Sequence, residues 1–583
     1  MRNYWYCLSV VLLLLCCTLQ GQTEKYFWQY YGTDSLQEMS DRIVALNDDL
    51  YIAIGVDFDP VGPGQRVTLW AVNAKGELQW NRIFGDYTAP NSTLQINITQ
   101  ERHINFVMHT RPFATYYLSR YLIELDSLGQ TQKYISLMDT TTTWSNTAYH
   151  IINNQHGSGY ITAATATDSS EISSLPKPNI CLIDTAGNYI WHRIFSYLPS
   201  YGRVNYITPA ADGGYYLSGF TNYVFEGRGY SDCLLLKTDS EGREEWHSIK
   251  DFADIEGLGD TYEINDSTFV GIIGYTNWVT INGIVEEKER CGIITQFDRE
   301  QNMQWTSPCL CENRGIRRLL HLTDGSWVGM GEYLSDEPYW LRIELFKLDA
   351  TGNVLWQRHY GTDERLHYYA GSVAELSDGS FVMSGRVTGP RTLVGASSDA
   401  LIFKVNCLGL QTEPEADFTI TANSWGTVAF ENHSQYVYED SIGGGHYVWD
   451  FGDGTSLSAK EAAHSYTRSG TYEVRLQAIV CQDTATFTQK VAINVPAPAV
   501  YDMLLTNTQP SGGLMEVLYD IPEAGEHALV LYDVLGREVA RVAVASATRG
   551  QAVVSLAAVA SGMYIIALTQ SDKVILSRKV LVI

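Results

Sequence analysis

The sequence predicts an all-β protein, with a seven-bladed β-propeller followed by two small immunoglobulin-like (Ig-like) β-sandwich domains. The chain of 583 residues contains 37 Tyr, 14 Trp and 49 Gly, and long amphipathic stretches with the period of a helix are missing. Residues 22–411 repeat one pattern of apolar runs and turns with a period in the fifties. Residues 414–583 consist of short alternating runs, as in small antiparallel sandwiches. A chain of this length needs several cores and therefore several domains.

The first 21 residues have the pattern of a secretory signal peptide. A single charge at Arg2 precedes an apolar run over residues 8–19, and the small residue Gly21 ends the segment. No segment approaches the ~18 apolar residues of a spanning helix, so the mature chain is expected to have no transmembrane span. A lipoprotein signal using Cys16 or Cys17 is the alternative, but neither cysteine follows a small residue.

The net charge excludes two classes of partner. The chain has 40 basic and 66 acidic residues, a net charge of −26. Loss of Arg2 with the signal peptide leaves 39 − 66 = −27 for the mature protein. Because nucleic acids and anionic membranes would repel such a polyanion, neither is expected as a partner.

The repeat in residues 22–411 is marked by one Asp or Asn turn in each copy, and the successive spacings are 53, 58, 55, 59, 51 and 57 residues. About four short strands fit in this period, which is the size of a propeller blade. The acidic or amide side chain is expected to cap its own backbone, and a following glycine to take positive φ. A Trp on the outermost strand is expected to fill the space between blades. The turn positions are Asn73, Asp126, Asp184, Asp239, Asp298, Asp349 and Asn406.

The two ends of the repeat predict how the ring closes. The last copy stops at Gly409 without a Trp-containing strand, whereas an isolated one begins near Trp28 and matches the segment at Trp356. The N-terminal strand is therefore expected to complete the last blade and leave no open sheet edge. Six and eight blades remain alternatives to seven. The repeat resembles the secreted β-propeller repeats of Bacteroidota, which implies an architecture rather than an activity.

The longest insertions in the repeat are candidates for a binding surface. They are rich in Tyr, Pro, Gly and Thr, residue types that suit stacking and hydrogen bonding to a glycan or a protein. Solvated hairpin tips are the alternative interpretation. The insertions are residues 57–68, 110–119, 168–178, 222–231, 276–290 and 387–398.

Residues 414–496 form the next unit after a short polar linker. The unit contains a Trp-Asp-Phe-Gly-Asp-Gly run followed by a Gly-Thr-Tyr strand, and it resembles a PKD domain, an Ig-like sandwich. Trp449 and Phe451 are expected in the core, while Asp450 and Asp453 shape the turn. Calcium binding by these two carboxylates is the alternative. The motif residues are Trp449, Asp450, Phe451, Gly452, Asp453 and Gly454.

Residues 500–583 carry the motifs Tyr532-Asp533-Val-Leu-Gly536-Arg537-Glu538, Ser-Gly562-Met-Tyr564 and Ser-Arg578-Lys579. They resemble the type A C-terminal sorting domain of the type IX secretion system of Bacteroidota. The resemblance implies export through the periplasm and the outer membrane, recognition by the secretion machinery, and removal or surface attachment. A generic Ig-like end domain is the alternative. The motif residues are Tyr532, Asp533, Gly536, Arg537, Glu538, Gly562, Tyr564, Arg578 and Lys579.

The seven cysteines after the signal peptide are an odd number. One disulfide from Cys291 to either Cys309 or Cys311 is expected in an oxidising compartment, and Cys309-x-Cys311 lacks the second pair of a zinc site. The recognised nucleophile, metalloprotease and phosphate-loop motifs are missing, so no catalytic residue and no cofactor are predicted. The acidic cluster at residues 286–289 is interpreted as a solvated loop between two strands.

These observations favour a secreted or cell-surface binding protein. The propeller face would recognise a glycan or a protein, and the PKD unit would act as a spacer. The alternative is an extracellular polysaccharide-degrading enzyme, a lyase or glycosidase, with carboxylate, Tyr or His groups in the propeller channel. Converging Asp, Glu, His or Tyr side chains in one pocket would favour the enzyme, and an open aromatic shelf would favour binding.

Overall fold

A computed structural model gives the architecture of the chain. The signal-peptide region lies outside the described residues. The structure describes residues 25–583 except 33–36, 59–63, 86–90, 93–94, 100, 111–118, 138–143, 169–176, 197, 199–200, 226–227, 253–254, 282–283, 312–313, 336–339, 362, 364, 390–397, 425, 438–444, 496–499, 507–512 and 546–547.

The all-β prediction is confirmed: every regular element in the described residues is a strand, and none of them forms a helix that could cross a membrane. The chain divides into two compact units, Met1–Glu413 and Pro414–Ile583. The strands of the first unit are β1 (Trp28–Tyr31), β2 (Gln37–Asn47), β3 (Leu50–Phe58), β4 (Gln65–Asn73), β5 (Leu78–Phe84), β6 (Asn91–Ser92), β7 (Ile96–Ile98), β8 (Ile104–Thr110), β9 (Ser119–Leu125), β10 (Thr131–Ser136), β11 (Trp144–Asn153), β12 (Tyr160–Asp168), β13 (Lys177–Ile183), β14 (Tyr189–Ile194), β15 (Tyr201–Pro209), β16 (Tyr215–Phe225), β17 (Arg228–Thr238), β18 (Glu244–Lys250), β19 (Ile255–Asn265), β20 (Thr268–Ile281), β21 (Ile284–Asp298), β22 (Met303–Thr306), β23 (Gly315–His321), β24 (Trp327–Leu334), β25 (Leu341–Leu348), β26 (Val354–Tyr360), β27 (His367–Glu375), β28 (Phe381–Thr388) and β29 (Ser398–Val405).

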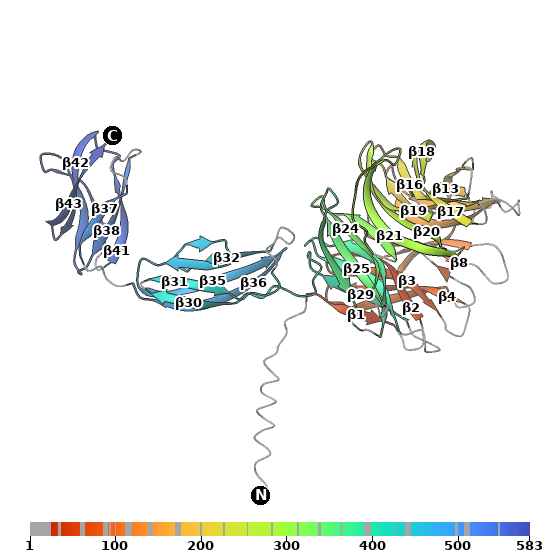
Figure 1. Ribbon diagram of the computed structural model, residues 1–583, viewed down its shortest axis with the longest axis horizontal. Helices are drawn as coiled ribbons and strands as arrows, with labels where there is room; N and C mark the ends of the chain where they lie inside the picture. The colour runs from red at the N-terminus through yellow and green to blue at the C-terminus, as the bar shows by residue number, and fades with distance from the viewer. Residues whose placement is uncertain are drawn as a thin grey trace, which may run out of the picture. The chain divides into compact units, whose positions relative to one another are not determined.

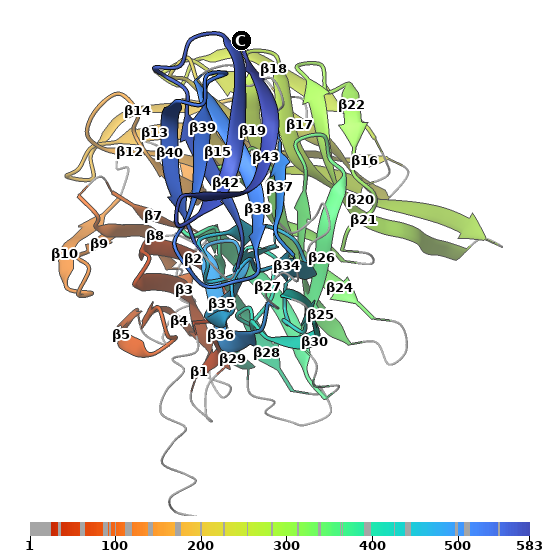
Figure 2. The same ribbon diagram turned by 90° about the vertical axis from the view of Figure 1, so that its left-hand side faces the viewer.

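In the described part of the first unit these strands form antiparallel groups in chain order: β2–β5, β6–β10, β11–β14, β15–β18, β19–β22, β23–β26, and β27–β29 with β1. Single parallel bridges join two pairs of groups, between β2 and β29 and between β17 and β19. The inner strands contact one another in a closed order, β2, β7, β11, β15, β19, β23, β27 and β2 again. The outer strands β5, β10, β14, β18 and β22 lie at the periphery in Figure 2, and β18 is also labelled at the edge of the propeller in Figure 1. This arrangement is a β-propeller with a central channel.

The predicted turns follow the third strand of each group and are confirmed by their hydrogen bonds. Each Asp or Asn oxygen accepts the backbone N–H four residues later, for example Asp184 from Asn188 at 2.8 Å and Asp349 from Asn353 at 3.0 Å. The other five turns have the same bond at 2.8–2.9 Å. The repeat is therefore fixed by local turn chemistry as well as by its strands.

The outermost strands pack against the turn of the next group, as predicted. A Cβ added to Gly352 would lie 2.3 Å from the ring of Trp305, and one added to Gly129 would lie 2.8 Å from Trp80. In these groups the aromatic ring therefore lies against a residue with no side chain in the group that follows. The fifth turn departs from the pattern, because Gln301 takes the glycine position with a φ of 59°.

The closure prediction is confirmed, with a correction of one residue. β1 pairs antiparallel with β29, so the N-terminal strand completes the last group. However, Phe27 rather than Trp28 corresponds to Trp356: Phe27 O accepts Lys404 N, and a Cβ on Gly76 would lie 2.5 Å from the Phe27 ring. Trp28 lies on the opposite face of the strand, 4.4 Å from Phe403 between ring centroids. A slip of one residue reverses the face that each side chain occupies.

Two predicted loops are strands instead. The acidic cluster at residues 286–289 lies in β21, and the 276–290 insertion is a long hairpin of β20 and β21 that projects from the other sheets in Figure 2. The strands reach almost to the tip, where Ile281 pairs with Ile284. β-Branched residues favour strands. Val, Thr and Ile are frequent near this tip, and their strand preference outweighs the loop preference of the neighbouring charged residues. The disulfide joins Cys291 to Cys309, and Cys311 is buried and free.

The second unit contains two sandwiches, each with a three-stranded and a four-stranded sheet. In the first, Trp449 and Phe451 are buried in the core as predicted. The Asp453 carboxylate accepts Thr455 N at 3.0 Å and lies 2.8 Å from His464 Nε2, which is a turn-forming role. The strands are β30 (Phe418–Ser424), β31 (Thr427–Asn432), β32 (His446–Asp450), β33 (Ser456–Leu457), β34 (Ala462–Ser465), β35 (Gly470–Val480), β36 (Asp483–Ile493), β37 (Asp502–Leu505), β38 (Leu514–Ile521), β39 (His527–Tyr532), β40 (Glu538–Val544), β41 (Thr548–Ser555), β42 (Gly562–Gln570) and β43 (Lys573–Val582).

Candidate functional site

The six long insertions all belong to one edge of the propeller sheets. Each of them connects the second and third strands of a group, from β3–β4 through β28–β29. Because these connections are equivalent in every group, they begin and end on the same face, which we call the long-connection face. The central residues of several insertions lie outside the described residues. The insertions at 222–231 and 276–290 differ from prediction, since strands continue into both.

A cavity of about 530 Å³ opens on this face among β15, β16, β17, β19, β20, β21 and β23. Aromatic side chains of Tyr206, Phe220 and Tyr275 line it together with the amides of Asn205 and Asn222. Such a mixture of apolar area and directed polar groups is typical of ligand sites. The sequence analysis located the connections but not this cavity, because its lining residues come from three different groups.

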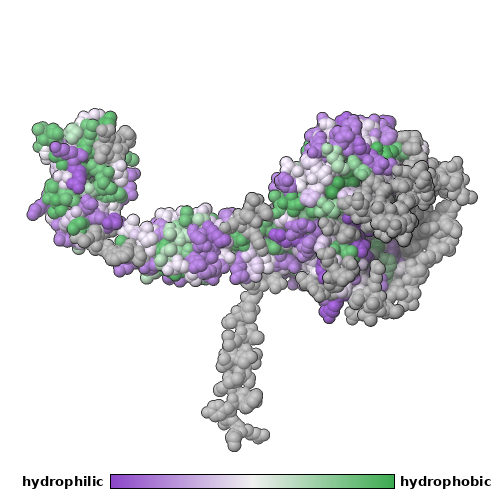
Figure 3. All heavy atoms as spheres, viewed as in Figure 1, coloured by the Kyte–Doolittle hydropathy of each residue, from purple (hydrophilic) through white to green (hydrophobic). Residues whose placement is uncertain are grey.

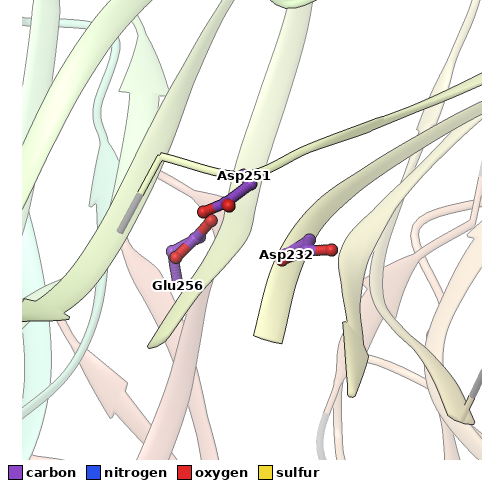
Figure 4. A group of neighbouring side chains, drawn as sticks. All are labelled: Asp232, Asp251 and Glu256. Atoms are coloured by element: carbon purple, nitrogen blue, oxygen red, sulfur yellow. The ribbon is translucent and has the colours of Figure 1, made fainter. Parts of the chain in front are cut away.

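Three carboxylates lie beside the cavity. Oxygen atoms of Asp232, Asp251 and Glu256 lie within 4.8 Å of one another, and Figure 4 shows the Asp251 and Glu256 carboxylates turned toward each other. Burial, and then the charge of Asp251, raise the pKa of Asp232. Glu256 is buried and accepts Phe252 N at 2.6 Å. No sequence motif predicts this cluster, because Asp232 lies in β17, Glu256 lies in β19 and Asp251 lies in the connection between β18 and β19.

Polar side chains also meet inside the channel, at equivalent positions of the inner strands. In six of the strands this position lies at a β-bulge, where the register of pairing shifts. A bulge re-aims a side chain away from the regular alternation. We call this set the channel ring. Its members are Arg42, Gln95, His150, Tyr206, Asp260, Arg318 and Ser372.

Contacts between neighbouring groups place these residues at one level of the channel. Arg318 Nη1 lies 2.7 Å from Asp260 Oδ1, and its guanidinium lies 5.7 Å from the centroid of the Tyr206 ring. The Tyr206 ring meets the His150 ring edge-on at 5.9 Å. Arg42 Nε donates to Gln95 Oε1 at 3.3 Å. A cavity of about 250 Å³ lies against Arg42, Gln95, Arg318 and Ser372.

The sorting-motif residues lie in the last sandwich. Asp533 Oδ1 accepts Leu535 N and Arg537 N, both at 2.9 Å, and Gly536 has a φ of 79°. This turn has the same hydrogen bonds as the propeller turns. Tyr564 OH donates to Ala560 O at 2.8 Å. Glu538 pairs with Arg541, while Arg578 and Lys579 are exposed on β43 and Gly562 begins β42.

Residues 411–495 match the family of PKD domains. This segment is a PKD domain. The PKD domain is similar to the PKD1 domain of Epp from Vibrio anguillarum, with 32% identity, 15% of this chain and 98% of that chain covered, and a TM-score of 0.13. None of the curated proteins matches this chain. A PKD domain and a disulfide fit an extracellular protein.

Two solved structures are similar to the propeller. One is the β-propeller domain of the Trilobed protease from Pyrococcus furiosus, with 10% identity, 65% of this chain and 96% of that chain covered, and a TM-score of 0.34. The other is prolyl oligopeptidase B from Galerina marginata, with 12% identity and a TM-score of 0.31. That match covers 61% of this chain and 47% of the peptidase.

Proposed function

We propose that this protein is secreted or held at the cell surface, and that its propeller binds a glycan or a protein through the long-connection face. The cavity of about 530 Å³ carries this proposal. Tyr206, Phe220 and Tyr275 offer ring faces for stacking, and Asn205 and Asn222 offer both donors and acceptors. The PKD domain then acts as a spacer between the propeller and the C-terminal sandwich.

A second candidate function is polysaccharide cleavage. The cluster of Asp232, Asp251 and Glu256 supports it, because close carboxylates with different burial are suited to acid and base roles. The raised pKa of Asp232 keeps a proton available over a wider pH range than an exposed carboxyl would. Binding remains the first proposal, because aromatic rings and amides line the adjacent cavity and Glu256 is the one carboxylate among its described lining residues.

For the C-terminal sandwich we propose the type IX sorting role that its motifs imply. Apolar residues are exposed on this domain (green in Figure 3). Leu504 and Leu518 form an exposed cross-strand pair on β37 and β38, and Met563 and Leu581 form another on β42 and β43. Exposed apolar pairs of this kind support recognition by another protein, such as the secretion machinery at the outer membrane.

The binding proposal is tested by applying the mature chain to arrays of glycans and extracellular matrix proteins, followed by a product assay on every hit. Tyr275→Ala and Asn222→Ala, both in the cavity lining, should weaken binding by about tenfold or more. Tyr134→Ala is the matched control, because Tyr134 is 51% exposed on the outer strand β10. A ligand bound equally by all three variants would place recognition elsewhere, and release of shortened saccharides would establish the enzyme instead.

A further inference from the structure

The channel ring contains two guanidinium groups, and among the described residues only that of Arg318 lies in a direct ion pair with a carboxylate. Asp260 pairs with Arg318 and also accepts Leu319 N at 3.0 Å, so both of its oxygens are used. Arg42 is bound only to neutral oxygens, Gln95 Oε1 at 3.3 Å and the Asp41 carbonyl at 3.0 Å. Burial, and then the charge of Arg318, lower the pKa of Arg42. An added negative charge between the two guanidinium groups would relieve both effects.

The carboxylates of Asp260 and Asp41 act on Arg42 and raise its pKa, but burial and the charge of Arg318 outweigh them. The bulged residue Asp41 faces Arg42, Arg386 and Arg317, and burial raises the pKa of its carboxyl group. Arg317 is paired with Glu332 at 3.1 Å.

Two buried donors at the same level have no partner in the residues that the structure describes: His150 Nε2 and Arg318 Nε. His150 is 9% exposed, and its Nδ1 accepts Ile207 N at 3.1 Å. The ring hydrogen therefore sits on Nε2, which makes this atom a donor. Burial, Arg318 and Arg42 lower the pKa of His150 to about 3, so the imidazole is neutral at physiological pH. Buried donors left without an acceptor are costly and call for a ligand.

We propose that the channel ring is a binding site for one anionic group, a carboxylate, sulfate or phosphate, held between Arg42 and Arg318. The adjacent cavity of about 250 Å³ has room for such a group together with part of the molecule that carries it. Arg42 and Arg318 supply charge-assisted hydrogen bonds, and Gln95 and Ser372 supply neutral ones. The long-connection face would then select a ligand whose acidic group reaches the channel, a statement that rests on the proposed function. Binding of the anion itself does not rest on it.

The test uses the full mature chain and simple anions. Sodium sulfate, phosphate and acetate are titrated by calorimetry at constant ionic strength set with NaCl, which keeps general screening equal. The wild type should bind in a saturable manner with one site. Arg42→Gln and Arg318→Gln should each weaken binding by about tenfold or more. Arg243→Gln is the control, because Arg243 is 61% exposed at a turn outside the channel.

A measurement on the wild type guards against variants that do not fold. Crystals soaked in selenate should show an anomalous peak between Arg42 and Arg318. The absence of that peak, or equal affinity of Arg42→Gln, Arg318→Gln and Arg243→Gln, overturns the inference. If binding is saturable but the selenate peak lies outside the channel ring, the site holds an adventitious ion only. That result overturns the inference as well.

A comparison of glucuronate with glucose separates this inference from the proposed function. Preference for glucuronate, lost in Arg42→Gln, supports an acidic saccharide as the source of the anion. Binding of sulfate in the channel, with no hit on the glycan or protein arrays, supports the channel ring and removes the proposed function. If the wild type binds no simple anion but Arg42→Gln still gives hits on the arrays, the proposed function is supported and the channel-ring inference is overturned.

Discussion

Gly352 shows how a single residue sets the joint between two neighbouring groups. Its φ is 87°, a conformation that costs a residue with a Cβ about 1–2 kcal/mol. Its missing side chain also leaves the space that the ring of Trp305 fills, since a Cβ there would lie 2.3 Å from that ring. Only glycine meets both demands, because it adopts a positive φ without strain and has no side chain. The missing Cβ of Gly352 therefore determines both the turn and the packing of Trp305.

The two demands can be separated with a matched pair of variants. Gly325 has a φ of 81°, but a Cβ there would meet nothing within 4 Å. Gly325→Ala is therefore expected to destabilise the propeller by about 1–2 kcal/mol through its backbone alone. Gly352→Ala should cost about 1–3 kcal/mol more, because the ring of Trp305 must move. Urea unfolding of both variants measures the difference, and equal losses would contradict the packing role of Trp305.

Acid should weaken the turn at Asp349. Burial raises the pKa of Asp349, but hydrogen bonds from Asn353 and Thr351 outweigh it and bring the pKa to about 2, below the ~3.9 of an unfolded aspartate. A carboxyl with a depressed pKa stabilises the fold above its unfolded pKa, and this stability is lost as the pH falls from about 4 to about 2. Asp349→Asn is the comparison, since Asn73 and Asn406 form the same turn. The wild type should have a higher melting temperature than Asp349→Asn above about pH 4, and this difference should disappear as the pH falls to about 2. A difference in melting temperature that does not change with pH would refute this account.

The sequence predicted these turns well because their chemistry is local. Asp184 and Asn188 are four residues apart, so spacing alone identifies the bond. The carboxylates of Asp232, Asp251 and Glu256 could not be predicted in the same way. They meet only after β17 and β19 lie side by side, and that pairing depends on the whole propeller.

At the scale of elements, β1 is a short strand with a large effect. It pairs with β29, the Phe27 ring lies over Gly76 of the first group, and Tyr31 OH donates to Gly76 O. The segment from Phe27 to Tyr31 therefore joins the two ends of the ring: its backbone and Trp28 contact the last group, while Phe27 and Tyr31 contact the first. The ring is closed by a segment that is far from its partner strand in sequence.

Deleting residues 22–32 is expected to lower the melting temperature of the whole propeller rather than loosen one end. Loss of the buried ring of Phe27 alone should cost about 3–5 kcal/mol, and the unpaired edge of β29 adds to this. Deletion of residues 22–24, which leaves β1 intact, serves as the control. An unchanged melting temperature after deletion of residues 22–32 would contradict the conclusion that the N-terminal strand stabilises the closed propeller.

The order of elements was predictable, whereas their register was not. Alternation and turn spacing located the strands, yet the match of Trp28 to Trp356 was wrong by one residue, because Phe27 and Trp28 are both aromatic and face opposite sides. The channel ring escaped prediction for a related reason. Its residue types follow no repeated pattern from group to group, and each bulge becomes visible only when the paired strand is known.

At the scale of the whole molecule, each module has its own core. The cores of the PKD domain and the C-terminal sandwich contain no residue of the propeller. Independent cores are the physical basis for treating recognition, spacing and export as separable functions. The split between Glu413 and Pro414 follows a change of motif in the sequence, whereas the lining of the proposed binding cavity is gathered from several groups.

Removing residues 564–583 tests the export proposal. The truncation deletes β43 and most of β42, and with them Val580 and Val582 of the core. The protein should stay in the periplasm while the propeller and PKD domain remain folded by limited proteolysis. Val580→Asp, at a buried position, should act similarly, and Val574→Asp, at a position 50% exposed, should not. Normal amounts of truncated protein outside the cell would refute the sorting role.

The contact between an outer-strand ring and the next turn always runs in one direction around the propeller. Each copy except the last thus carries both halves of the joint, a side chain on its outer strand and a small residue at its turn, and the N-terminal segment supplies the missing half of the last copy. Ile135 in place of a ring, and Gln301 in place of a glycine, change the fit of a joint without changing its direction. A gene that gained or lost one copy would keep every joint intact, and only the angle between sheets would need to adjust. The number of copies in such a chain is therefore limited by the angle between neighbouring sheets that closes the ring, whereas each added copy brings its own joint residues.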